Sequence, residues 1–391
     1  MYRQIILALI FGAALLFSES LPEPAKAFFY GLSLSVKSLI LFVLPIVVFG
    51  LLFKTLQEFS KKASSLIFVI LFGIILSNFS STLTAFLPGS LAYGLDMSLK
   101  LPKEILPLDP LFVFNLPQII PTREAMLLGL VSGLVLSRFF PAFSKSLSVF
   151  FERGVARLLK GITLLIPLLI LGFIVKMKHD QILGLMIKNY ALIFVWVLAA
   201  ALSYILFLYL LASGFRLKLA FERIKNILPA SLTGFGAMSS AAAMPLTILG
   251  AEKNGKDPSL AASFIPATVN VHLVGDCFAI PIFSFAILKS FGMAMPDLIT
   301  YFLFASYFVF AKFSVAAIPG GGILVMLPIL EKTLGFTPEM LALITALYIL
   351  FDPVITGMNV LGNGALALIL EKFAPTPKRA LDSEVVEEID F

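Results

Sequence analysis

Long apolar runs separated by short polar segments dominate the pattern of this chain. A membrane-spanning helix needs roughly 20 apolar residues to cross a hydrocarbon layer of about 30 Å, and most of the runs are close to or above that length. The pattern therefore predicts an all-α polytopic membrane protein with eight transmembrane helices. The predicted spans lie near residues 4–18, 32–56, 64–87, 124–140, 154–176, 183–213, 258–292 and 338–372.

Two further apolar segments, 227–250 and 298–330, are interrupted at their centres. The first carries Ser239 and Ser240 in its middle, and the second carries Pro319 followed by three glycines. Non-helical backbone is tolerated at membrane depth only where it is buried in protein or lines a cavity. Two such interruptions in corresponding places indicate re-entrant helical hairpins, built from inverted repeats, that meet at a transporter's binding site. The alternative is that glycine and proline only kink two ordinary spans, because transmembrane helices are richer in both residues.

Composition and charge agree with lipid as the solvent. Hydrophobic residues make up 59% of the 391 positions, charged residues make up 13%, and the mean hydropathy is +1.01. A water-soluble core cannot hold that much apolar surface, so soluble classes are excluded. The net charge of +6 comes from basic clusters between the runs, which predict topology rather than nucleic-acid binding. They put both termini on the cytoplasmic side of the inner (plasma) membrane, although Lys176, Lys178 and His179 then fall on the opposite side.

Few residues are available for redox, metal or covalent chemistry. Cys277 is the only cysteine, which excludes an intrachain disulfide, and His179 and His272 are the only histidines. A structural zinc site draws on several cysteines and histidines, and the sequence offers no clear pairing of a nucleophile with a base. We therefore expect neither an enzyme nor a bound cofactor.

The last predicted span carries a polar stripe. Asp352, Thr356, Asn359 and Asn363 stand at offsets of 0, 4, 7 and 11, which places them on one face of an α-helix. A carboxylate near the bilayer centre costs at least about 2.5 kcal/mol on insertion scales, so it usually marks a substrate or ion path. Pro353 removes a backbone donor beside the stripe and could loosen the helix there. The alternative is a polar clamp that holds helices together.

The span at 258–292 is predicted to break near its middle. His272 and Asp276 are one helical turn apart, with Gly275 between them to permit local unwinding. Asp276 needs a partner at membrane depth, and Lys312 in the second interrupted segment is the cationic candidate. A simple buried ion pair is the alternative and would be weak evidence for function. His272 is more typical of a hydrogen-bonded packing residue than of a proton carrier.

Together these motifs resemble the dicarboxylate/amino-acid:cation symporter (glutamate transporter homologue) family. Residues 239–247 are similar to the serine-rich tip of the family's first hairpin, residues 318–322 to the tip of its second, and residues 352–363 to the substrate-binding stretch of its eighth helix. The order of the elements, including Leu44-Pro45 in the second span, fits almost the whole chain. The chain is identified as a divergent member with eight spans and two hairpins.

The resemblance implies a homotrimer that works by an elevator motion in the lipid bilayer. Residues 1–63 and 93–180 would form a scaffold, and residues 64–92 and 181–374 a mobile transport unit. A cytoplasmic tail would follow at 375–391.

The resemblance also assigns an amino-acid substrate to the stripe. Asp352 matches the aspartate that holds the substrate's amino group, Asn359 the asparagine that binds its carboxylate, and Thr356 a lining threonine. Ile355 stands where the family has the arginine that pairs with an acidic side chain, so acidic substrates are disfavoured. Further substrate contacts would come from the hairpin tips, through Ser239, Ser240, Pro319, Gly320 and Gly321.

Three departures fall on the family's sodium sites and argue against ordinary sodium coupling. The family's Asn-Met-Asp-Gly-Thr motif falls on residues 272–276 and loses one aspartate, and a second sodium-binding aspartate falls on Asn363. Lys312 lies beside backbone that would cradle a third ion, where its ammonium could replace a bound cation. The open alternatives are no coupling ion, a proton carried by His272, Asp276 or Asp352, and residual sodium near Asn359 and Asn363.

The sequence thus predicts a secondary active transporter of amino acids, with neutral side chains preferred and cationic ones as the second choice. The alternatives are a sodium-coupled symporter of dicarboxylates or acidic amino acids and an anion channel on the same fold.

Overall fold

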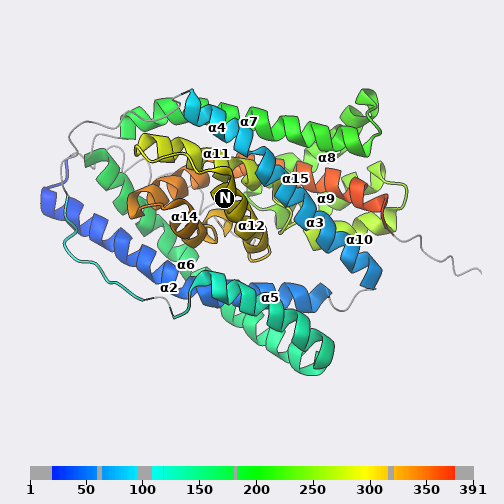
Figure 1. Cartoon of the computed structure of the whole chain (residues 1–391), viewed down its shortest axis with the longest axis horizontal. Helices are drawn as coiled ribbons and strands as arrows, with labels where there is room; N and C mark the ends of the chain where they lie inside the picture. The colour runs from blue at the N-terminus through cyan, green and yellow to red at the C-terminus, as the bar shows by residue number, and fades with distance from the viewer. Residues whose placement is uncertain are drawn as a thin grey trace, which may run out of the picture.

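The described part of the chain consists of α-helices joined by loops and contains no β-strand (Figure 1). The predicted span at 4–18 and the tail at 375–391 lie outside the described residues. The computed structural model describes residues 20–59, 64–95, 108–117, 119–179, 183–315 and 321–374.

The apolar runs between residues 32 and 213 all fold as helices. The run at 32–56 lies within α2, the run at 64–87 is shared between α3 and α4, and the next three runs correspond to α5, α6 and α7. The helices are α2 Glu23–Phe59, α3 Ser64–Thr84, α4 Phe86–Gly94, α5 Thr122–Phe139, α6 Pro141–His179 and α7 Leu183–Ala212.

Both interrupted segments fold as paired helices rather than as single kinked spans. In the first, α8 and α9 pack along each other and are joined through Met238, whose φ of 49° lies in the left-handed region. In the second, α12 packs against α14, and the short α13 lies between them in sequence. The helices are α8 Leu217–Ala237, α9 Ser240–Asn254, α12 Leu298–Lys312, α13 Gly321–Leu324 and α14 Leu327–Leu334.

The run at 258–292 is broken, as predicted, but the break lies slightly earlier than expected. Helix α10 (Pro258–Thr268) ends before it and α11 (Val274–Ser290) begins after it. Gly275 therefore lies in the first turn of α11 and does not unwind the chain. The last span, α15 (Pro338–Glu371), continues as a helix through Pro353, so the proline does not interrupt it.

Only part of the predicted membrane topology can be read from helix length. Among the described residues, three stretches are long and apolar enough to cross a membrane: Phe68–Gly94, Leu192–Ala212 and Pro338–Glu371. The break at 269–273 divides one predicted span into two short helices, which is why that span falls below the required length. The total of eight crossings stays a prediction.

The helices pack in two groups. Helix α2 lies along α5 and α6 at one side of the molecule (Figure 1), whereas α7 to α15, with α3 and α4, pack mainly on one another. Helix α15 is central to the second group, because it contacts α7, α8, α9 and α11. Contacts between the groups include a hydrogen bond from Ser314 Oγ to the Val48 carbonyl oxygen at 3.4 Å.

Apolar side chains cover much of the outer surface as well as the core. Soluble monomers rarely expose contiguous apolar patches larger than a few hundred Å², so rows of exposed leucine and phenylalanine on several helices indicate a lipid-facing surface. Such rows include Phe68, Phe72 and Leu76 on α3, Leu127, Leu128, Val131 and Leu134 on α5, and Leu298, Ile299, Phe302 and Leu303 on α12.

The base of the first hairpin provides a test of this packing. Buried Asn254 accepts a hydrogen bond from the Asn226 side chain at 2.7 Å and donates one to the Arg223 carbonyl oxygen at 2.8 Å. We expect Asn254→Ala to lower the midpoint of thermal unfolding in detergent, because a buried polar group left unsatisfied costs about 1–3 kcal/mol. Lys253→Ala, at an exposed neighbouring position, is the control. Equal midpoints for the two variants would contradict the packing.

Candidate functional site

A small polar cavity lies where α15 meets the first hairpin, the second hairpin and the break between α10 and α11. Its volume is about 40 Å³, which is more than the roughly 10–15 Å³ that one water molecule requires. Its wall includes Ser239 and Ser240 from the first hairpin and Asp352, Thr356 and Asn359 from α15. The structure therefore brings these five predicted substrate-binding residues together, although they are far apart in sequence.

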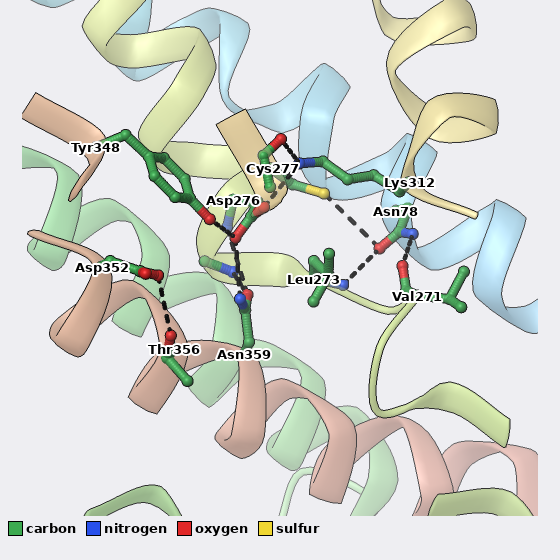
Figure 2. Close-up of polar contacts among 12 residues, drawn as sticks. Asn78, Val271, Leu273, Asp276, Cys277, Lys312, Tyr348, Asp352, Thr356 and Asn359 are labelled. Carbon is green, nitrogen blue, oxygen red and sulfur yellow. Dashed lines mark hydrogen bonds and ion pairs between the residues drawn. The ribbon is translucent and has the colours of Figure 1, made fainter. Parts of the chain in front are cut away.

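Asp276 lines this cavity and is the centre of a buried polar network (Figure 2). Its Oδ2 lies 2.7 Å from Nζ of Lys312, and both side chains are almost completely buried, with exposures of 0% for Lys312 and 1% for Asp276. Its Oδ1 accepts hydrogen bonds from Tyr348 Oη at 3.0 Å and from Asn359 Nδ2 at 2.9 Å. The carboxylate is thus neutralised by one ammonium and held by two further donors from α15.

Lys312 connects this network to the second hairpin. Its Nζ also donates to the Gly322 carbonyl oxygen at 3.3 Å and lies 4.5 Å from the centre of the Phe308 ring. A Cβ at Gly322 would overlap the Asp276 carboxylate and the Tyr348 hydroxyl, so only glycine fits this close approach. The lysine is buried in the network and does not reach a membrane interface.

Asn359 anchors the start of α11 on α15. Its Oδ1 accepts hydrogen bonds from the backbone N–H groups of Gly275 at 2.7 Å and Asp276 at 3.4 Å. The first N–H groups of a helix have no partner within the helix, so Asn359 supplies one. Gly275 lies against the Ile355 carbonyl oxygen, and a Cβ there would crowd it. Gly275 therefore serves close packing between the two helices, instead of the predicted unwinding.

Two polar residues near the cavity were not predicted from the sequence: Tyr348 in the Asp276 network and Asn78 at the break. Asn78 on α3 donates to the Val271 carbonyl oxygen at 2.9 Å and accepts the backbone N–H of Leu273 at 3.2 Å. It thus satisfies backbone groups that the break leaves without helical partners. An asparagine in the middle of a strongly apolar run was the available signal for Asn78, whereas a tyrosine in an apolar helix gives none.

His272 and Asn363 form a separate set of contacts at the break. His272 Nε2 is 2.8 Å from Ser77 Oγ, and Asn363 Nδ2 donates to the carbonyl oxygens of His272 at 3.3 Å and Asn359 at 2.9 Å. His272 Nδ1 and Asn363 Oδ1 are buried without a hydrogen-bond partner among the described residues. Residual sodium was expected near Asn359 and Asn363, and in this geometry the side-chain amide of Asn363 donates to the two carbonyl oxygens instead.

Asp352, the acidic residue of the polar stripe, lies in the cavity wall. Its Oδ1 accepts a hydrogen bond from Thr356 Oγ1 at 3.1 Å, one helical turn away (Figure 2). Both residues are buried at 5% exposure and line the cavity. At the residue after Thr356, Ser231 Oγ donates to the Gly357 carbonyl oxygen at 2.9 Å, which fixes the first hairpin against this part of α15.

The hairpin tips differ in how much of them can be described. Ser239 caps α9 by accepting the Ala242 N–H at 3.3 Å, and Gly321 is the first residue of α13 and is buried. Pro319 and Gly320 lie outside the described residues. Ile355 is fully buried, with its carbonyl oxygen against α11.

A helical membrane protein in which two hairpins and a broken helix converge on a polar, charged cavity is typical of secondary transporters. The model of the sodium:dicarboxylate symporter family matches residues 1–373. The chain belongs to this family.

Among curated proteins, the chain is similar to excitatory amino acid transporter 1 from several mammals. It is 27% identical to the Mus musculus protein over 264 residues, which cover 66% of this chain and 47% of the relative. The Bos taurus protein gives the same identity and coverage, and the Homo sapiens protein is 26% identical over the same length. The chain thus aligns with about half the length of these relatives.

Gly322 allows a test of the network geometry. We expect Gly322→Ala to lower the thermal midpoint of the detergent-solubilised protein, because a side chain forced into a filled space typically costs about 1–3 kcal/mol. Gly161→Ala, where a Cβ meets no atom within 4 Å, is the matched control and should leave the midpoint unchanged or raise it. A Gly322→Ala protein as stable as the control would show that the hairpin does not lie on Asp276.

Proposed function

We propose that this chain is a secondary active transporter that carries neutral amino acids across the inner (plasma) membrane. One observation carries the proposal: the cavity wall presents Asp352 together with hydroxyl groups, while the nearby Lys312 ammonium is already paired with Asp276 at 2.7 Å. Among the described residues of the wall, none is arginine or lysine. The cavity is therefore suited to a ligand that brings its own positive charge.

Charge balance makes an amino-acid zwitterion a good occupant. Lys312 and Asp276 neutralise each other, so the proposed partner of the substrate's ammonium group is Asp352, the other carboxylate of the wall. A buried charge is tolerated when it is paired and hydrogen-bonded, and an α-ammonium group can donate up to three hydrogen bonds to Asp352 and its neighbours. Thr356 Oγ1, which contacts Asp352, would position that carboxylate for the substrate.

Hydrogen-bond donors elsewhere in the cavity wall would hold the substrate carboxylate. Ser240 at the start of α9 lines the cavity, and the backbone N–H groups at a helix start favour an anion. A side-chain amide has two N–H groups. Asn359 uses one to bind Asp276, so its second could turn to the substrate. Cationic amino acids are the second choice, because Asp352 would compensate only one of their two positive charges.

The family description names a dicarboxylate carried with sodium, and the mammalian relatives are named excitatory amino acid transporters, which favours the alternative of an acidic substrate. Ile355, at the position where the family resemblance places a substrate-binding arginine, offers no donor to a second carboxylate. Two like charges 4 Å apart repel by about 4 kcal/mol at an effective dielectric constant of 20, so a second carboxylate near Asp352 would be costly.

An anion channel on this fold would be recognised by chloride flux into liposomes without amino-acid flux.

The same proposal includes an elevator motion in a homotrimer. The packing of α2 with α5 and α6, separate from the group around α15, supports a static scaffold and a moving unit that carries the cavity. The exposed apolar rows of the outer helices supply surface for both lipid and neighbouring subunits. Both termini would lie in the cytoplasm.

Asp352→Asn tests the role of the one carboxylate in the polar stripe. We expect it to weaken binding of neutral amino acids by about 2–5 kcal/mol, the usual cost of leaving one member of a buried charge pair without its partner, or at least ~30-fold in affinity. Calorimetric titration of the purified protein with L-alanine, L-serine and L-leucine measures this. Size-exclusion chromatography should show unchanged assembly. Loss of the assembly instead of the binding would support a polar clamp between helices.

Binding of acidic amino acids tests whether Ile355, which stands in place of an arginine, disfavours a second carboxylate on the substrate. Aspartate and glutamate should bind no more tightly than L-alanine or L-serine in the same titrations, in sodium as well as in choline buffer, because a second carboxylate finds no cationic partner in the described wall. Micromolar binding of aspartate, with weak binding of neutral amino acids, would replace the proposed substrate by that of the mammalian relatives.

A further inference from the structure

A buried ammonium lies where the second hairpin meets the core of the protein. Lys312 is the last residue of α12 and is completely buried. Its Nζ contacts a carboxylate oxygen of Asp276 at 2.7 Å, a backbone carbonyl oxygen of Gly322 at 3.3 Å and the face of the Phe308 ring at 4.5 Å. Oxygen ligands and an aromatic face are what a small or organic cation binds in proteins.

This arrangement joins three separate parts of the chain. The lysine comes from the first helix of the second hairpin, the carbonyl oxygen of Gly322 from its returning arm, and Asp276 from the first turn of α11. Asp276 is in turn held by Tyr348 and Asn359 of α15. The ammonium therefore holds both arms of the hairpin against the helices that line the cavity.

Stability alone gives little reason to retain such a pair. Replacing a buried ion pair by apolar residues of similar volume is often neutral or stabilising, whereas removing one member leaves an uncompensated charge. Without Lys312, the Asp276 carboxylate and the Gly322 carbonyl oxygen would face a space once filled by a positive charge. An alkali cation satisfies both oxygens, since it needs several oxygen ligands and negative charge nearby.

We propose that the Lys312 ammonium is a resident cation, which holds the second hairpin on α11 and α15 in place of a bound sodium ion. The ion site implied by the family name thus does not fit at Asp276, because the protein's own side chain occupies it. Holding the hairpin on α11 and α15 then needs no sodium. The corollary that amino acids bind equally well without sodium rests on the proposed function.

The consequence for stability can be measured without any substrate. The native protein should have the same melting temperature in sodium chloride and in choline chloride of equal ionic strength. Lys312→Ala should melt at a lower temperature in choline and regain most of the loss as sodium is added, with saturation, because sodium enters the vacated space. Lys312→Gln, which also removes the charge but leaves less room, should melt lower in choline and recover less.

Two further variants assign the effect to this pair. Lys312→Ala combined with Asp276→Asn removes the anion as well as the cation, and its melting temperature should not respond to sodium. Lys289→Ala removes a lysine that lies 4.7 Å from the ring of Tyr93, away from the Asp276 network, and should behave as the native protein does in both salts.

Several outcomes would overturn the proposal. Stabilisation of the native protein by sodium over choline would show that an ion still binds, and equally low melting temperatures of Lys312→Ala in both salts would make the pair purely structural. If folded Lys312→Ala protein cannot be purified in either salt, the same conclusion follows. All of these melting temperatures are measured in the absence of amino acids. If the melting temperatures agree with the expectation but no amino acid binds the native protein, only the proposed substrate is rejected.

Discussion

A carboxylate buried among apolar helices must be neutralised and hydrogen-bonded, and the arrangement of this protein's centre depends on how that is done for Asp276. The ammonium of Lys312 neutralises it at 2.7 Å, and Tyr348 and Asn359 donate to its second oxygen. These partners come from the second hairpin and from α15, while Asp276 itself lies in α11. The desolvated charge thus fixes three elements relative to one another, because moving any of them would leave a charge or a dipole without its partner.

The broken helix imposes a second requirement, since lipid offers no water to unpaired backbone groups. Three asparagine side chains meet it. Asn78 binds the backbone of Val271 and Leu273, Asn363 binds the carbonyl oxygen of His272, and Asn359 caps the first turn of α11. An amide side chain carries both donors and an acceptor, so it can satisfy N–H and C=O groups alike. The break next to the cavity is therefore supported from both α3 and α15.

The two acidic residues near the cavity have different environments. Asp276 is saturated by partners from its own chain, whereas Asp352 lines the cavity and is held by Thr356 from the next helical turn. Two carboxylates close to each other in a transporter need not both serve the substrate or an ion. The structure thus gives the Asp276 charge a partner within the protein, while Asp352 borders the cavity in which the substrate is proposed to bind.

The sequence by itself determined the membrane class, the helical runs, the two interrupted segments and the polar stripe, because apolar length and helical periodicity are local properties. It also indicated Asp276 and Lys312 as partners, since a charge at membrane depth needs one. The tertiary structure decided which groups meet: Asn359 turns toward α11, Tyr348 enters the Asp276 network, Asn78 binds the backbone of the break, Gly275 packs instead of unwinding, and Asn363 faces two carbonyl oxygens. Hydrogen-bond pairing between helices depends on how they approach in space, and periodicity along one helix carries no information about that approach.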